Sequence, residues 1–351
     1  MNKTITIKDR IISADSPTFV VAEISGNHNH DYNRAVEIIQ AAGEAGADAV
    51  KLQTYTPDTI TLDCDNEYFQ LTRGTIWDGV TLHELYQTAY TPWDWQPRLK
   101  EEAEKRGLIC FSTPFDLTSV DFLAGLAMPA YKIASYEIND IPMIRKAAAL
   151  KKPLVIATGI AYPEEISLAL KTCREAGNED VILLKCTSSY PTPYEDSNIK
   201  NIPTLAGEYD CLVGLSDHTL GSAVALGAVA LGAVMVEKHL TLRRADGGPD
   251  AAFSMEPAEF AAMIAQIRII EQALGREEYT LSAGQIRERE GGRSLFAVRD
   301  IAAGETLTPE NIRSVRPAIG LLPKHYEEVL GKTAAHDIPY GTPLAWEMLK
   351  P

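Results

Sequence analysis

Eight short apolar runs, each followed by a helical stretch, constrain the fold of this chain more than any other feature. The runs are continuous in Val, Ile and Leu, which is typical of strands buried on both faces of an all-parallel sheet. Helical stretches with amphipathic spacing end at Gly46, Gly107 and Gly177, as helices commonly do. The runs cover residues 18–24, 49–54, 108–111, 130–133, 153–157, 181–185, 211–215 and 234–238.

Eight β/α units within residues 1–275 predict a TIM barrel, the closed (β/α)8 fold. A doubly wound open sheet is the alternative, but no GxGxxG motif opens the first helix. We expect residues 1–16 to form a hairpin or lid over one end of the barrel. Residues 63–90 are aromatic-rich and predict an insertion at the barrel mouth, where loops carry specificity.

The character of the chain changes after Gly275. Residues 276–292 are highly charged and predict a linker. Residues 293–351 predict a small separate domain, in which the segment DIAAG at 300–304 is echoed by DIPYG at 337–341. Its core would be thin, so docking onto the barrel or onto a partner would help to stabilise it.

Bulk properties narrow the function classes. A net charge of −15 disfavours a nucleic-acid or anionic-membrane surface. Five cysteines without a CxxC pair indicate reduced thiols in a cytoplasmic protein. The N-terminus has no signal-peptide pattern, and no apolar run is long enough to cross a membrane.

Polar side chains end the apolar runs, and in a TIM barrel the carboxyl ends of the strands carry the chemistry. Lys51, Lys132 and Lys185 stand inside apolar runs, where a lysine is costly unless it is paired. Three converging lysines with nearby hydroxyls predict a pocket for a phosphate or carboxylate. The alternative is that each lysine pairs with a carboxylate across the barrel.

His218 and His239 end two consecutive runs, so both should face the same space. Neutral imidazoles suit a divalent transition metal. The alternative is two unrelated histidines, one in a turn and one in the core. Cys186 is interpreted as a core residue, because no histidine is near it in the sequence.

Carboxylates complete the predicted site. Glu23 ends the first run, and Glu137 and Asp250 lie in loops at the same edge. Such groups serve as metal ligands, as general bases or as partners for a substrate hydroxyl.

The motifs at these positions together resemble the sialic acid synthase family over nearly the whole chain. They are AEISGNH at 22–28, KLQT at 51–54, FSTPF at 111–115, YKIAS at 131–135, KCTSSYP at 185–191, GLSDH at 214–218 and EKH at 237–239. SVRP at 314–317 and GK at 331–332 resemble the SAF (antifreeze-like) domain of that family. Within the family, residues 53–58 and 77–92 resemble the branch that makes pseudaminic acid.

The resemblance implies that phosphoenolpyruvate condenses through its C3 with the aldehyde of an open-chain amino sugar, and that phosphate leaves by C–O cleavage. The sugar of the pseudaminic branch is a 2,4-diacetamido-2,4,6-trideoxy-altrose. Legionaminic or N-acetylneuraminic acid synthesis is the alternative, and a non-catalytic glycan-binding protein is a more remote one.

The resemblance also implies roles for single residues. His218 and His239 would hold a divalent metal, Mn²⁺ first, with Mg²⁺ or Co²⁺ as alternatives. Glu23 would orient or deprotonate the attacking water, Glu137 and Asp250 would act on the sugar, and Arg316 would reach the sugar across a domain-swapped homodimer. The residues implied for phosphoenolpyruvate are Lys51, Thr113, Lys132, Ser135, Thr158, Ser188, Tyr190 and Ser216. Family members often carry Ser where Thr158 stands and Asn where Ser188 stands.

Overall fold

The computed structural model describes residues 1–72, 74–276 and 278–350. These residues form two compact units, Met1–Gly275 and Arg276–Pro351. Among them, no helix is both long and apolar enough to cross a membrane.

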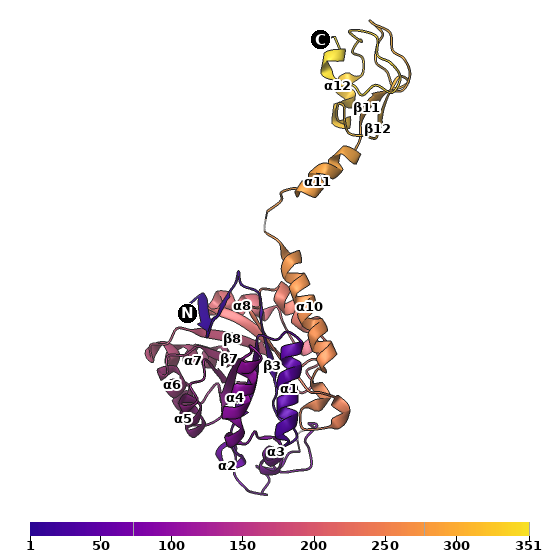
Figure 1. The fold of residues 1–351 in the computed structure, drawn as a ribbon. Helices are drawn as coiled ribbons and strands as arrows, with labels where there is room; N and C mark the ends of the chain where they lie inside the picture. Colours follow the sequence, from indigo (N-terminus) through magenta and orange to yellow (C-terminus); the bar gives the residue numbers. More distant parts are fainter. Residues whose placement is uncertain (73, 277, 351) are drawn as a thin grey trace. The chain divides into compact units, whose positions relative to one another are not determined.

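The first unit is a closed barrel of eight parallel strands, which confirms the predicted fold and excludes the open sheet (Figure 1). The last strand pairs with the first, so no edge is left unpaired. Each strand overlaps one of the eight apolar runs. The strands are β3 Phe19–Glu23, β4 Ala49–Thr54, β5 Ile109–Pro114, β6 Tyr131–Ile133, β7 Leu154–Ala157, β8 Val181–Cys186, β9 Leu212–Asp217 and β10 Met235–His239.

Helices follow the strands and cover the outer surface of the barrel (Figure 1). Local signals fix where they begin: Asp31 accepts hydrogen bonds from the first turn of α1, and proline stands in the first turn of α7 and α10. Their apolar faces pack on outward strand residues such as Val50 and Leu183. The helices are α1 Tyr32–Glu44, α4 Gln96–Lys105, α5 Leu117–Gly125, α6 Ile141–Ala149, α7 Pro163–Glu175, α8 Asn201–Tyr209, α9 Ala223–Ala230 and α10 Pro257–Leu274.

A hairpin formed by β1 (Thr4–Ile7) and β2 (Arg10–Ser13) precedes the barrel. Its Ile5, Ile7 and Ile12 are fully buried in one cluster with inward residues from the amino-terminal halves of the barrel strands. Arg10 adds an ion pair of 2.6 Å to Asp48, which lies just before β4. The hairpin therefore fills the amino-terminal end of the barrel, and the opposite end remains for ligands.

The segment between β4 and α4 is the insertion at that opposite end, where Figure 1 shows α2 and α3. It contains α2 (Pro57–Ile60), α3 (Leu82–Ala89) and the 3-10 turn η1 (Trp93–Trp95). The indole N–H of Trp77 donates to the carbonyl oxygen of Pro249 at 2.7 Å. This bond ties the insertion to the loop after β10.

The second unit begins with α11 (Ala283–Glu288), which has no buried residue. Its small apolar core is formed by residues of β11 (Ser294–Ala297), β12 (Ile312–Val315), α12 (Tyr326–Val329) and the loops between and after them. The two echoed segments pair with each other through Ile301 and Ile338, whose N–H groups donate reciprocally at 2.9 and 2.8 Å. Asp300 and Asp337 each accept a backbone hydrogen bond of 2.7 Å from the other segment. The repeat is thus a local two-fold arrangement.

Candidate active site

Alternation along the barrel strands directs one set of polar side chains into the interior at the carboxyl end. The register pairs Glu23 with Lys51 on β4 and with His239 on β10. These interior side chains are almost completely buried. The inward set, which comes from six strands, is Glu23, Lys51, Thr113, Lys132, Ser216, His218, Glu237 and His239.

Two lysines and two carboxylates form the floor of this site. Lys51 pairs with Glu23, donates to the hydroxyl of Thr113 at 3.0 Å, and has its Nζ 3.6 Å from Oε1 of Glu237. Nζ of Lys132 lies 3.4 Å from the same Oε1 of Glu237. The anion pocket and the pairing with carboxylates are therefore not exclusive alternatives. Lys51 and Lys132 converge in one pocket, and each is also paired with a carboxylate.

The electrostatics of the floor follow from burial and pairing. Burial raises the pKa of Glu23, and Lys51 offsets this only in part. Burial alone would lower the pKa of Lys132, but Glu237, Cys186 and Glu23 together raise it. Burial likewise opposes ionisation of Glu237, but Lys132 and Lys51 together lower its pKa. Lys132 and Glu237 thus hold each other in the charged state.

Lys185 does not join this pocket, and the prediction of three converging lysines is wrong. Its neighbour Cys186 belongs to the interior cluster, so alternation turns Lys185 toward the helix layer. There its Nζ donates to the carbonyl of Cys186 at 2.5 Å and to the hydroxyl of Thr187 at 3.0 Å. The apolar run alone did not show on which face the lysine lies.

Serine hydroxyls gather above the floor at the ends of β6 and β8. A Cβ added at Gly159 would lie 2.3 Å from Oγ of Ser188 and 2.7 Å from Oγ of Ser135. Both hydroxyls therefore close over the bare backbone at the end of β7. The hydroxyl of Thr158 instead donates to the carbonyl of Leu184 at 3.1 Å, and that of Ser216 to Glu237 at 3.4 Å.

His218 and His239 face each other, with ring centroids 5.3 Å apart. Nδ1 of His218 lies 3.0 Å from the carbonyl oxygen of Thr187, which can only accept, so Nδ1 carries the proton and Nε2 keeps its lone pair. Nδ1 of His239 lies 3.1 Å from Oγ of Ser25. Burial, and then His218, lower the pKa of His239 well below its usual value, which keeps it neutral. Burial alone would lower the pKa of His218, but Cys186 and the carbonyl of Thr187 together raise it. In their neutral forms, two imidazoles with anchored Nδ1 atoms fit a divalent metal.

No group of three or more His, Cys, Asp or Glu residues that could hold a metal occurs in the parts of the chain that the structure describes. A metal at the two histidines would therefore take its remaining ligands from water and substrate.

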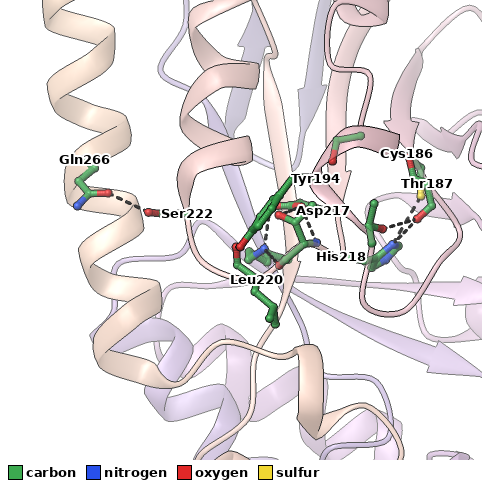
Figure 2. A network of polar contacts seen from close by, with 12 residues as sticks. Cys186, Thr187, Tyr194, Asp217, His218, Leu220, Ser222 and Gln266 are labelled. Carbon is green, nitrogen blue, oxygen red and sulfur yellow. Dashed lines mark hydrogen bonds and ion pairs between the residues drawn. The ribbon is translucent and has the colours of Figure 1, made fainter. Parts of the chain in front are cut away.

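The side chain of Asp217, the residue directly before His218, points to the opposite face of β9. Figure 2 shows the side chains of Asp217 and His218 in separate groups of contacts, His218 with Thr187 and Cys186, and Asp217 away from them. Asp217 pairs with Lys238 at 2.7 Å on the helix-facing side, and both side chains are buried. This outer ion pair joins the ends of β9 and β10 and so fixes the positions of both histidines.

Cys186 lies closer to a histidine than the sequence indicated. Its Sγ is 3.9 Å from Nδ1 of His218 and 3.7 Å from Oγ of Ser135. Burial raises the pKa of this thiol, but His218, Lys132 and Ser135 together lower it to about 7. Cys186 was interpreted as a core residue because no histidine is near it in the sequence, and that reason is wrong. Its side chain does pack in the interior cluster.

Two carboxyl groups lie at the mouth above this layer. Burial, which Lys132 offsets only in part, raises the pKa of Glu137 to about 7, and its Oε2 accepts no hydrogen bond from another described residue. Oδ2 of Asp250 is 3.5 Å from the backbone N–H of Gly26, and burial raises its pKa. Both groups have acceptor capacity left for a substrate hydroxyl or amide.

Aromatic rings form one wall of the site. Tyr190 lies 4.4 Å from His218, 5.3 Å from Phe253 and 5.6 Å from Trp77 between ring centroids. Phe253 also lies 4.9 Å from His239. Sequence reasoning assigned no role to Phe253, and no local signal marked it.

Glu237 also received no role from the sequence, although a signal existed. It stands two residues before His239 on the same strand, so the same alternation that directs the histidine inward directs Glu237 inward.

The predicted sugar ligand Arg316 belongs to the second unit, where its side chain is exposed. His28 is a structural residue whose Nε2 lies 3.0 Å from the hydroxyl of Thr91 in the insertion.

Comparison with known proteins identifies the family. The model of the NeuB family matches residues 38–279, and that of the SAF domain matches residues 292–350. The chain belongs to the NeuB family. This confirms the resemblance to sialic acid synthases and excludes the non-catalytic glycan-binding alternative.

Individual relatives cover almost the whole chain. It is 44% identical to the pseudaminic acid synthase of Campylobacter jejuni (strain 81-176) over 95% of this chain and 96% of that protein. It is 35% identical to the N,N'-diacetyllegionaminic acid synthase of Legionella pneumophila over 95% of this chain and 94% of that protein. Among solved structures, the N-acetylneuraminic acid synthetase of Leptospira borgpetersenii, in complex with citrate, superposes with a TM-score of 0.73 at 31% identity, covering 82% of this chain and 95% of that one.

Proposed function

We propose that this protein condenses phosphoenolpyruvate with 2,4-diacetamido-2,4,6-trideoxy-altrose and water to give pseudaminic acid and inorganic phosphate. The observation that carries the proposal is the meeting, at one barrel mouth, of the floor of paired lysines, the hydroxyls of Ser135 and Ser188, and two facing histidines. The 44% identity to a pseudaminic acid synthase, against 35% to a legionaminic acid synthase, supports this choice of sugar.

The lysines of the floor and the hydroxyls of Ser135 and Ser188 bind phosphoenolpyruvate. Lys51 and Lys132 exchange part of their contact with Glu23 and Glu237 for the phosphate and carboxylate of phosphoenolpyruvate. The hydroxyls of Ser135 and Ser188 point to the same space above Gly159. We assign Thr113, Ser216 and Tyr190 to the same anion, since Thr113 contacts Lys51 and Ser216 contacts Glu237 in the floor. Thr158 has its hydroxyl bonded to the backbone.

The reaction forms a bond between C3 of phosphoenolpyruvate and the aldehyde carbon, and the aldehyde oxygen takes up a proton. Water adds at C2, and the C2–O bond to phosphate breaks. Glu23, whose pKa is raised by burial, is placed to take the proton of that water. Glu137 and Asp250 hold hydroxyl or amide groups of the sugar.

A divalent metal, with Mn²⁺ as first choice and Mg²⁺ or Co²⁺ as alternatives, would be held by Nε2 of His218 and of His239. It would supply Lewis-acid polarisation of the aldehyde. His218→Ala should bind less than one equivalent of Mn²⁺ after dialysis, as measured by metal analysis. A variant that keeps full metal content would contradict this role.

We propose a domain-swapped homodimer in which Arg316 reaches the sugar in the partner's barrel. The exposure of Arg316 and the thin core of the second unit support this arrangement. A cytoplasmic location fits a chain whose five cysteines are all free, and a phosphoenolpyruvate-dependent reaction. Light scattering tests the dimer, and a monomer would contradict it.

Phosphate release with each candidate sugar, with mass spectrometry of the product, tests the function directly. We expect turnover with the 2,4-diacetamido-trideoxy-altrose. Turnover with N-acetylmannosamine alone, or with the legionaminic precursor alone, would contradict the proposed sugar while keeping the reaction type.

A further inference from the structure

Trp77 is the outermost ring of the aromatic wall, and hydrogen bonds fix the backbone on both sides of it. Asp78 accepts from the backbone N–H groups of Gly74 and Thr75 at 2.7 and 3.0 Å. Two backbone hydrogen bonds of 3.0 Å close this segment: the N–H of Leu71 donates to the carbonyl of Val80, and the N–H of Gly79 donates to the carbonyl of Leu71. Trp77 is half-buried, whereas the other described residues between 72 and 80 are exposed.

The ring turns toward the barrel mouth, not toward solvent. It lies 5.6 Å from Tyr190, whose other neighbours are His218 and Phe253. Its N–H donates to the carbonyl of Pro249, the residue before Asp250. Trp77 therefore bridges the insertion and the loop after β10, next to a carboxylate that faces the site.

The contacts from His218 through Tyr190 to Trp77 indicate where Trp77 lies relative to the reacting atoms. In the proposed reaction the phosphate binds at the lysine floor and the aldehyde lies near the two histidines. The ring of Tyr190 contacts both His218 and Trp77. The end of the sugar farthest from its aldehyde must then lie against the wall formed by Tyr190 and Trp77. An indole face favours apolar groups and provides no partner for a buried hydroxyl.

We infer that Trp77 is a specificity-determining residue, which packs on the apolar substituents at the far end of the sugar and disfavours a hydroxymethyl group there. This inference rests on the proposed function. The sugar proposed above carries a methyl group at C6 and acetamido groups at C2 and C4, whereas N-acetylmannosamine carries hydroxyl groups at C4 and C6. A ring at this place favours the first sugar by burying its methyl groups.

The test compares Trp77→Ala, Trp77→Phe and, as a control in the same turn, Ile76→Ala, whose side chain is 49% exposed. We expect Trp77→Ala to raise KM for the diacetamido sugar about 10-fold or more, the effect of losing one buried aromatic contact. KM for phosphoenolpyruvate should stay unchanged, and the preference for the diacetamido sugar over N-acetylmannosamine should fall. Ile76→Ala should match the wild type.

Trp77→Phe keeps a ring and loses only the N–H bond to Pro249, so it should retain the sugar preference with a rise in KM of about five-fold, typical of one hydrogen bond. Titration with the diacetamido sugar should change the tryptophan fluorescence of the wild type but not that of Trp77→Phe. An unchanged sugar KM and preference in Trp77→Ala, or an equal rise in KM for phosphoenolpyruvate, would overturn the inference. The product made by the wild type tests the proposed function separately, since it does not depend on these variants.

Discussion

Glu237→Gln provides the sharpest test of how the floor of the site works. The substitution keeps the shape of the side chain but removes the charge that faces Lys132 at 3.4 Å and Lys51 at 3.6 Å. Breaking a buried pair by removing one partner costs about 3–5 kcal/mol, because the remaining charge stays buried without compensation. Lys51 keeps Glu23 as its partner, which favours the lower end of that range.

A loss of about 3 kcal/mol should lower the melting temperature of the barrel by about 6 °C, given roughly 2 °C per kcal/mol for a domain of this size. Phosphoenolpyruvate should then stabilise the variant more than the wild type, because its negative charge replaces the missing carboxylate. If phosphoenolpyruvate recovers half of the stability lost in Glu237→Gln, its Kd for the variant is about 10-fold lower than its Kd for the wild type. Thermal unfolding at increasing phosphoenolpyruvate concentrations measures both effects.

Asp217→Asn is the matched control, because the Asp217–Lys238 pair is equally buried but lies on the helix-facing side of the same two strands. It should destabilise the barrel by a similar amount, and phosphoenolpyruvate should bring no extra gain. Equal stabilisation of the wild type and Glu237→Gln by phosphoenolpyruvate would refute the idea that Glu237 occupies the charge position of the substrate.

The remaining predictions concern single positions in the site. The folded-state pKa of Glu137 is about 7 against 4.5 in the unfolded chain, so stability should fall as the pH rises between these values; Glu137→Gln should flatten that dependence in thermal unfolding. Gly159→Ala should raise KM for phosphoenolpyruvate more than KM for the sugar, since the methyl group displaces two hydroxyls. Lys132→Met should weaken phosphoenolpyruvate binding in calorimetry, whereas Lys185→Met, on the outer face, should not. Arg316→Ala should raise KM for the sugar and leave phosphoenolpyruvate affinity unchanged; a collapse of that affinity would contradict its proposed contact.

Much of the fold was predictable because it depends on patterns that are local in the sequence. Continuous apolar runs indicate strands buried on both faces, and their alternation with helical stretches leaves few topologies besides a barrel. The same alternation placed Glu23, Lys51 and His239 at the carboxyl ends of strands, where the structure brings them together. The echo between residues 300–304 and 337–341 indicated a local repeat, which the structure shows as paired segments.

Other features depend on which face of a strand a side chain takes and on contacts between distant segments. A run such as VILLK is apolar on both faces, so only the closed barrel decided that Lys185 points outward while Cys186 points inward beside His218. Glu237 became the partner of two lysines only when β4, β6 and β10 were closed into one ring.

The sequence by itself determined that eight strands would present lysines, carboxylates and two histidines at one end of a barrel, because strand periodicity and chain order are local properties. Only the tertiary structure decided the pairing of those charges, the proton position on His218 and the bridge from Trp77 to Pro249. Each of these depends on a distance between segments far apart in the chain, and no local pattern encodes such a distance.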